Sequence, residues 1–366
     1  MTTRGQTLRL ATRGSTLALR QAGEVRAALE SPRRTVELVE VETRGDQIRD
    51  ELIHRLGKTG AFVRSLDEEV LAGEVDAAVH SMKDMPTEFP EDLVVAGVPA
   101  RASARDVLVT PDGTALADLP DGATVGTGSL RRKAQLLAAR PDLDVRPLRG
   151  NVDTRAEKLL APSLQREHEA RLEAEEAEEG EEADGTDERT TEEWFDGLSE
   201  LERRALGREV ETAFDAVVLA EAGLYRSGLT NHLSFQQLSP TTFVPAAGQG
   251  ALAVTASDPD VIGRLHDALD HPPTRVTTTV ERTVLKHLGG GCIAPIGVHA
   301  RLQGEHVAVV VRVLAPDGSE EVRETRSLSV EKHPEEARRF AEALRERGAA
   351  DLIEDARRTT AGTREE

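Results

Sequence analysis

A lysine and an aspartate stand together at the end of an apolar run, in the stretch Asp76-Ala-Ala-Val-His-Ser-Met-Lys-Asp-Met-Pro86. The run from Asp76 to His80 is typical of a short strand buried on both faces, and Pro86 prevents a regular continuation. Because ligands bind at the carboxyl ends of strands in open α/β sheets, Lys83 and Asp84 are candidates for a functional site. The alternative is an ordinary salt bridge at the surface.

A second group of candidates is rich in arginine. The segment Gly126-Thr-Gly-Ser-Leu-Arg-Arg-Lys-Ala-Gln135 joins a predicted strand to a predicted helix, and Ser129 is placed to cap that helix. Free N–H groups and the positive end of the helix dipole would then face a ligand. Guanidinium groups match the geometry of carboxylates and phosphates. This segment and the turn after the next strand supply four of them: Arg131, Arg132, Arg149 and Arg155. The alternative is a set of solvated arginines in an arginine-rich chain.

The charges of these residues predict an anionic substrate. Arg13 ends the first predicted strand, so it should face the same cleft as Lys83 and the four arginines. The cleft would then hold one carboxylate, Asp84, among six cations, which suits a polyanionic substrate. Asp84 could act as an acid or base, or could stabilise a developing positive charge. The neighbouring cations favour its ionised form.

The single cysteine, Cys292, follows three glycines and precedes Pro295. One cysteine excludes an intrachain disulfide and a cysteine-based zinc cluster. The histidines show no ligand-like spacing, so we predict no metal. A lone cysteine is most often a small buried hydrophobe, but the glycines would allow the backbone to hold this thiol on an exposed, sharply turned loop. The pattern permits a thiol that is used covalently.

Composition excludes several classes of protein. The 366 residues contain no run of eighteen apolar residues, and the start of the chain lacks the apolar stretch of a signal peptide, so we expect a cytoplasmic protein. A net charge of −20 argues against nucleic acid as the partner. Only six of the 46 basic residues are lysine. An acidic, lysine-poor surface suits a cytoplasm of high salt, so we hypothesise a halophilic source.

Alternating strands and helices predict two α/β units. The expected strands of the first are 8–12, 35–41, 76–80 and 94–98, and those of the second are 107–110, 124–127, 145–148 and 216–220. We expect helices over 17–29, capped by Ser15 or Thr16, and over 61–72. This alternation predicts mostly parallel sheets with crossover helices. Two crossings, near residues 100 and 247, predict two lobes with a hinge and a central cleft.

The domain boundaries follow from these elements. We place the first lobe at 5–100 and 248–268, the second at 101–247 and a C-terminal domain at 272–366. The last is expected to be a small α+β domain, with helices over 281–288 and 334–347 and strands over 307–314 and 321–328. An acidic segment, 163–211, interrupts the second lobe. Its middle predicts disorder or an exposed helix, and Trp194, Leu198, Leu201 and Ala205 predict an amphipathic helix at its end.

Long motifs in a fixed order resemble the hydroxymethylbilane synthase (porphobilinogen deaminase) family. They are Ala11-Thr-Arg-Gly-Ser, Thr43-Arg-Gly-Asp, Val79-His-Ser-Met-Lys-Asp-Met-Pro, Gly126-Thr-Gly-Ser-Leu-Arg-Arg, Leu148-Arg-Gly-Asn-Val-Asp-Thr-Arg, Leu219-Ala-Glu-Ala-Gly-Leu, Pro245-Ala-Ala-Gly-Gln-Gly and Gly289-Gly-Gly-Cys-Ile-Ala-Pro-Ile-Gly. They cover nearly all of the chain except the acidic segment. In one departure, Lys58 is displaced by one position from the family's Gly-Gly-Lys-Gly-Leu-Phe, and in another Gly128 replaces a common serine.

The resemblance implies a fold, a reaction and a cofactor. The fold would be α/β, with two lobes like those of periplasmic binding proteins and a third domain that bears the cysteine. The reaction would be a transferase step of porphyrin and heme biosynthesis, in which four porphobilinogen units condense with loss of ammonia and leave as hydroxymethylbilane, a linear tetrapyrrole. A dipyrromethane cofactor, attached by a thioether to Cys292, would prime the chain, and a monomer is expected.

The resemblance also assigns roles to residues. Asp84 matches the catalytic aspartate, expected to aid departure of the amine and to stabilise a positive azafulvene-like species. The substrate- and cofactor-binding set comprises Arg13, Ser15, Gln21, Ser81, Lys83, Thr127, Ser129, Arg131, Arg132, Arg149, Gly150 and Arg155. There are two alternative functions. One is a non-catalytic two-lobed binder of a small carboxylate, which would need neither Cys292 nor Asp84. The other is a regulatory protein that acts through the acidic segment.

Overall fold

The computed structural model describes residues 6–41, 61–178, 190–289, 291 and 294–362. Within these ranges the chain forms three sheets, two with five strands and one with three. Cys292, Lys58 and the motif that begins at Thr43 lie outside the described residues, so their predicted roles stay predictions.

The first sheet has the strand order β2-β1-β3-β10-β4. Its strands are β1 (Gln6–Thr12), β2 (Arg34–Glu40), β3 (Ala77–Ser81), β4 (Val94–Gly97) and β10 (Leu252–Ala256). Helices α1 (Thr16–Leu29) and α9 (Pro259–Leu269) share one apolar cluster with the sheet, and α3 (Ala61–Leu71) shares another. Apolar side chains on both faces explain why β3 is almost continuously buried.

The second sheet has the strand order β7-β6-β8-β5-β9. Its strands are β5 (Asp106–Thr110), β6 (Thr124–Gly126), β7 (Asp144–Arg146), β8 (Ala216–Ala220) and β9 (Ser234–Gln237). Helix α4 (Leu130–Ala139) packs on one face and α5 (Val152–Glu178) on the other. Helix α8 (Glu221–Arg226) follows β8 directly.

Both large sheets are mixed, but in each of them four strands run in one direction, as expected for mostly parallel sheets, and a single strand runs against them. In the first sheet β1 is parallel to β2 and β3, whereas β10 is antiparallel to β3 and β4. In the second, β6 is parallel to β7 and β8, whereas β5 is antiparallel to β8 and β9. The antiparallel strands are those beside the two crossings between the sheets, where the chain enters a sheet without a preceding crossover helix.

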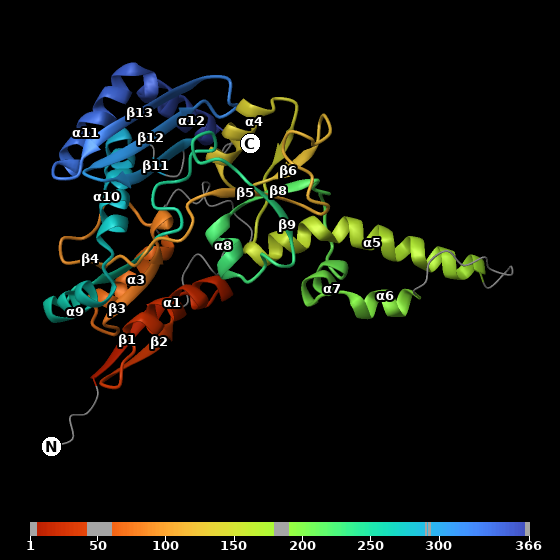
Figure 1. The fold of residues 1–366 in the computed structure, drawn as a ribbon, viewed down its shortest axis with the longest axis horizontal. Helices are drawn as coiled ribbons and strands as arrows, with labels where there is room; N and C mark the ends of the chain where they lie inside the picture. The colour runs from red at the N-terminus through yellow and green to blue at the C-terminus, as the bar shows by residue number, and fades with distance from the viewer. Residues whose placement is uncertain (1–5, 42–60, 179–189, 290, 292–293, 363–366) are drawn as a thin grey trace.

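The third sheet is an antiparallel meander of β11 (Ile296–Gln303), β12 (His306–Leu314) and β13 (Glu321–Ser329). It packs with α10 (Pro272–Leu288), α11 (His333–Leu344) and α12 (Ala350–Gly362) around one apolar cluster. Figure 1 shows α10 between this blue sheet and the first sheet. Helix α10 is longer than the expected 281–288 because His271 caps it and prolines occupy its first turn.

The acidic segment is more ordered at both ends than expected. Helix α5 continues through Pro162 as far as Glu178, so 163–211 does not begin as a separate excursion. Residues 172–176 of this helix are exposed, which confirms the exposed-helix alternative for that part of the segment. Two short helices, α6 (Thr191–Gly197) and α7 (Glu200–Leu206), replace the single expected helix, and they bury Trp194, Leu201 and Ala205. Figure 1 shows α5 and α6 projecting away from the rest of the molecule.

The α/β fold class with two lobes and a small C-terminal domain is confirmed. Within the described ranges, none of the helices combines the length and the apolar character required to cross a bilayer.

Candidate active site

Asp84 lies in a short turn at the carboxyl end of β3. The turn, Met82–Asp84, is a single 3-10 turn, and its two flanking methionines are buried, with Met82 2% and Met85 3% exposed. Lys83 between them is half-buried, and Asp84 is exposed. The buried methionines therefore anchor the turn on both sides and leave the charged pair at the edge of the sheet.

Gly248 supports this turn from the second crossing. It has a φ of +75°, and a Cβ at this position would lie 2.9 Å from Cγ of Met82. The turn is also tied to the crossing by a hydrogen bond from the Met82 N–H to the Ala251 carbonyl, 3.0 Å long. Only a glycine allows this approach without displacing the turn.

Electrostatic effects show that both sheets contribute charges to one site. Burial lowers the pKa of Lys83, and nearby Arg132 and Arg155 lower it further, whereas Asp84 opposes the shift. Burial also lowers the pKa of Arg155, to about 10, with Arg132 acting in the same direction and Asp84 against it. Lys83 and Asp84 come from the first sheet and the arginines from the second, so the structure brings these four predicted residues together.

Arg131 and Arg132 share one carboxylate, that of Asp106 at the start of β5. Nη1 of Arg131 lies 2.8 Å from Oδ2 of Asp106, and Nη2 of Arg132 lies 2.8 Å from Oδ1. Both guanidinium groups are buried, and the Asp106 side chain is fully buried. Burial alone would raise the pKa of Asp106, but the two arginines hold it well below its usual range. In this structure the two forks therefore point inward to Asp106.

Gln249 completes the surroundings of Asp106. Its side-chain amide donates to Oδ1 of Asp106, at 2.8 Å, and to the Ala104 carbonyl, at 2.6 Å. Arg131 in turn donates to the Val244 carbonyl, at 2.7 Å. Because Val244 and Gln249 lie on the second crossing, the buried arginine cluster is tied to the segment that joins the lobes.

Thr127, Ser129 and Gly150 lie at the carboxyl ends of the parallel strands β6 and β7. As predicted, Ser129 caps α4, and its Oγ accepts from the Arg132 N–H at 3.4 Å. Thr127 Oγ1 accepts from the Ser129 N–H at 3.2 Å. Gly150 has a φ of +113°, and its carbonyl accepts from Nε of Arg155 at 2.8 Å. These contacts fix Arg155 beside the end of β7.

The remaining predicted residues lie on the first sheet or beside Gly150. Arg13 and Ser15 follow β1, and Ser81 ends β3; because β1 and β3 are parallel, these residues lie at the same edge of the sheet. Ser15 caps α1, accepting from the Ala18 N–H at 3.3 Å. Gln21 lies half-buried on α1. Arg149 is half-buried beside Gly150.

Sequence reasoning missed Glu281, which joins both crossings to the C-terminal domain. Its carboxylate accepts two hydrogen bonds from Arg101, at 2.7 and 3.0 Å, and one each from the backbone N–H groups of Gly248, at 2.7 Å, and Ala300, at 2.8 Å. Burial would raise the pKa of Glu281, but Arg101 and His299, whose Nδ1 lies 3.4 Å from Oε1 of Glu281, lower it to about 2. The one visible signal was a glutamate at helical spacing from Val284 and Leu288, on the face of α10 that is buried.

The sequence matches two family models and several curated relatives over most of its length. The family described as "Porphobilinogen deaminase, dipyromethane cofactor binding domain" matches residues 8–171 and 201–262, and "Porphobilinogen deaminase, C-terminal domain" matches 276–347. A "Probable porphobilinogen deaminase" of Halobacterium salinarum is 57% identical and covers 96% of this chain and 98% of its own length. A "Porphobilinogen deaminase" of Syntrophobacter fumaroxidans is 37% identical, with 95% and 97% covered.

Solved structures match more remotely. An ABC transporter structure from Parabacteroides distasonis aligns with a TM-score of 0.35 at 13% identity, covering 96% of this chain and 95% of its own. On the strength of the family matches and of the curated relatives, the chain belongs to the porphobilinogen deaminase family.

Proposed function

We propose that this protein is a hydroxymethylbilane synthase, a transferase that condenses four porphobilinogen molecules head to tail with loss of ammonia and releases hydroxymethylbilane. The observation that carries the proposal is the position of Asp84. It lies at the carboxyl end of a buried strand, within the electrostatic reach of Lys83 and Arg155. A carboxylate among cations suits a reaction in which an anionic substrate loses an amine.

The residues of the site fit a dipyrromethane bearing carboxylates. Four cations, Lys83, Arg131, Arg132 and Arg155, accompany only two carboxylates, Asp84 and Asp106. Burial makes the positive charges of Lys83 and Arg155 costly, so a bound anion would stabilise them. When bound, the cofactor supplies the primer to which porphobilinogen units are added. We propose that it is attached to Cys292 and held by Lys83 and Arg155, while Arg132, which pairs with Asp106, adds positive charge to the site.

The chain's own residues have separate tasks in this proposal. Asp84 stabilises the positive charge that develops on a porphobilinogen unit as its amine departs, and its carboxylate can accept a hydrogen bond from the ammonium form of that amine. Lys83 and Arg155 bind the acetate and propionate groups. Thr127 and Ser129 order the loop before α4, and Arg13, Ser15, Gln21, Ser81, Arg149 and Gly150 complete the binding set.

The proposed function also implies the partners of the protein. Porphobilinogen is the expected small-molecule partner, no nucleic acid partner is expected, and the protein is expected to act as a monomer in the cytoplasm. The domain boundaries at 5–100 with 248–268, 101–247 and 272–366 also remain part of the proposal.

The function is tested by porphobilinogen consumption and ammonia release by the purified protein. Asp84→Asn should lower kcat by about 10²- to 10⁴-fold, the range for loss of a positioned acid or base. Glu88→Gln is the matched control, because Glu88 is an exposed acid in the same segment, 81% exposed, and pairs only loosely with Lys286. If the wild type is active and Asp84→Asn keeps the same kcat, Asp84 has no part in the reaction. A wild-type protein without turnover would refute the function.

A further inference from the structure

An arginine of the C-terminal domain contacts the turn that carries Asp84. Arg282 on α10 donates from Nη1 to the carbonyls of Met82, at 3.2 Å, and Met85, at 3.4 Å. Its Nη2 donates to the Pro86 carbonyl. One guanidinium group therefore contacts three carbonyls within five consecutive residues, and Asp84 lies between the first two.

The surroundings of Arg282 are unusual for a structural arginine. Within the described part of the chain it makes no salt bridge, and its guanidinium lies over the ring of Phe89, with 5.6 Å from Cζ to the ring centroid. Burial lowers the pKa of Arg282 to about 10. Even a half-buried cation without a carboxylate is costly, so a contact that offsets this cost is expected.

The turn gains donors that its own backbone cannot supply. Within the turn, the Met85 N–H donates to the Met82 carbonyl at 3.3 Å. The carbonyls of Met85 and Pro86 have no partner from a following strand, because residues 85–93 form neither helix nor strand. The planar guanidinium satisfies them together because its N–H groups are spread over separate nitrogens, whereas a lysine would have to reach all three carbonyls from one nitrogen. The fork thereby fixes the peptide planes on both sides of Asp84.

We propose that Arg282 is a positioning residue for the reaction of Asp84. It holds the turn Met82–Pro86 in the conformation that presents Asp84 and Lys83 to substrate, and it does so from the helix that leads to the cysteine loop. Helix α10 ends at Leu288, four residues before Cys292 in the sequence. The clamp therefore links the Asp84 turn to the domain that carries the predicted cofactor attachment. The inference rests on the proposed function.

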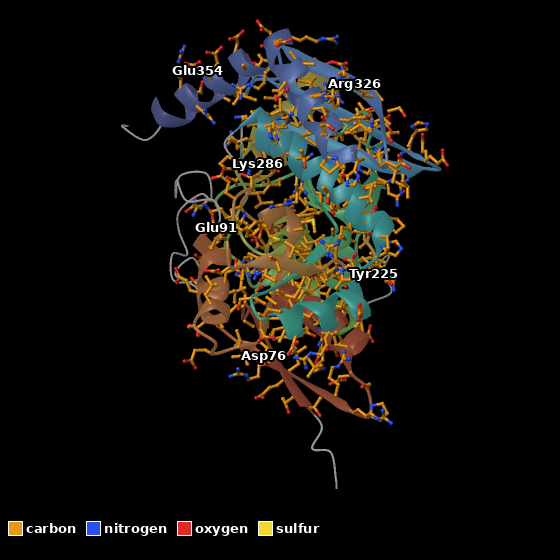
Figure 2. All side chains as sticks on the ribbon, turned by 90° about the vertical axis from the view of Figure 1, so that its left-hand side faces the viewer. Asp76, Glu91, Tyr225, Lys286, Arg326 and Glu354 are labelled. Atoms are coloured by element: carbon orange, nitrogen blue, oxygen red, sulfur yellow. The ribbon has the colours of Figure 1, made fainter. Side chains whose placement is uncertain are left out.

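The chain offers a matched control on the same helix. Lys286 lies one turn after Arg282, is half exposed, and approaches Glu88 to 3.8 Å, so it reaches the same segment without contacting the three carbonyls. Figure 2 shows Lys286 on the side of the molecule where the segment containing Glu91 lies. The variants are Arg282→Gln, Arg282→Lys and Lys286→Gln, each prepared as full-length protein from cells that make porphobilinogen.

Three readouts separate positioning from folding and from binding. Intact mass reports the cofactor, steady-state kinetics separate kcat from KM, and amide hydrogen exchange reports on residues 83–89. Arg282→Gln should retain the cofactor, lower kcat by about 10- to 100-fold, as expected for a slightly misplaced catalytic group, and change KM less than about threefold. Exchange at 83–89 should become faster. Arg282→Lys should show a smaller loss of kcat, and Lys286→Gln should stay within about twofold of wild type.

Several outcomes would overturn the proposal. A kcat within twofold of wild type in Arg282→Gln would do so, as would a rise in KM with unchanged kcat, which would make Arg282 a substrate-binding cation. If Lys286→Gln lost as much kcat as Arg282→Gln, the effect would come from removing a positive charge from α10 and not from the contacts to the three carbonyls. Should Arg282→Gln fail to fold, unchanged exchange and kcat in a folded Arg282→Lys would refute the clamp. Failure of the proposed function is distinguishable from failure of this inference, because the wild type itself would then not consume porphobilinogen.

Discussion

At the scale of single residues, Asp106 determines how the site holds its arginines. It is fully buried, and Arg131 and Arg132 both pair with it. Without it, two buried guanidinium groups would lie unpaired beside Lys83 and Arg155, at a large desolvation cost. Asp106 therefore lets the protein fold with several cations close together.

The position of Asp84 was predictable from the sequence, whereas the pairing of Arg131 and Arg132 was not. An apolar run followed by Lys-Asp and Pro86 gives a local signal for a strand and its end. The partner of the two arginines lies far earlier in the chain, on β5, and becomes their neighbour only because β5 and β6 both flank β8. No local pattern contains that information.

Glu281 should make stability depend on pH in the acid range. Its folded pKa of about 2 lies below the ordinary value of 4.5, so its contribution is fully present above about pH 4.5 and is lost as the pH falls towards 2. The shift corresponds to about 3 kcal/mol. Arg101 would lose its buried partner in Glu281→Gln, so this variant should be less stable than wild type by about 3 kcal/mol at pH 7.

Denaturant unfolding at pH 7, 4 and 3 checks this prediction. The difference in unfolding free energy between wild type and Glu281→Gln should shrink steadily as the pH falls. Other buried carboxylates such as Asp106 also respond to acid, but they are present in both proteins and cancel in the comparison. A difference that stays constant from pH 7 to pH 3 would contradict the account.

Among the helices and strands, the two lobes were predictable, but the one reversed strand in each large sheet was not. The alternation of strands and helices indicated two α/β units and crossings near residues 100 and 247. Strand β10 follows the second crossing and enters the first sheet antiparallel, between β3 and β4. Its sequence, Leu-Ala-Val-Thr-Ala, is equally compatible with either direction because it is buried on both faces. Strand β9 was missed because it is short and polar.

The acidic segment has a removable part and a structural part. Oε1 of Glu175 accepts from the Thr191 N–H at 2.7 Å, so the last turns of α5 lie beside the start of α6. Replacing residues 177–189 by a short glycine–serine linker should therefore leave the melting temperature and porphobilinogen turnover within experimental error of wild type. Turnover reduced more than about threefold would assign the segment a role in the reaction.

Trp194→Ala tests the structural part of the acidic segment, in contrast to the replacement of residues 177–189. The indole is 6% exposed and stacks with His168, with 5.9 Å between ring centroids. Its removal should cost about 3–5 kcal/mol of local stability, as for other buried aromatic residues. The whole segment 163–211 should not be deletable, because Leu201 belongs to the core of the second lobe.

At the scale of the whole molecule, the net charge of −20 sets the response to salt. A relative comes from the halophile Halobacterium salinarum, which agrees with the interpretation of the acidic, lysine-poor composition. Molar salt shortens the Debye length to about 3 Å and removes the self-repulsion of the acidic surface. The melting temperature should therefore rise when potassium chloride is raised from about 0.1 to 2 M.

A charge-reduced variant provides the control for this prediction. Glu169, Glu173 and Glu176 lie on the exposed part of α5, and changing all three to Gln should weaken the salt dependence without disturbing the core. A melting temperature indifferent to potassium chloride would contradict the halophilic interpretation.

Intact mass shows whether this chain builds hydroxymethylbilane on a covalently attached dipyrromethane. We would compare the wild type with Cys292→Ser, both purified from cells that make porphobilinogen. We expect a wild-type mass that exceeds the sequence by two linked pyrrole units, and a Cys292→Ser mass that equals its sequence. An unmodified wild-type mass, or an adduct that survives in Cys292→Ser, would refute the covalent attachment at Cys292.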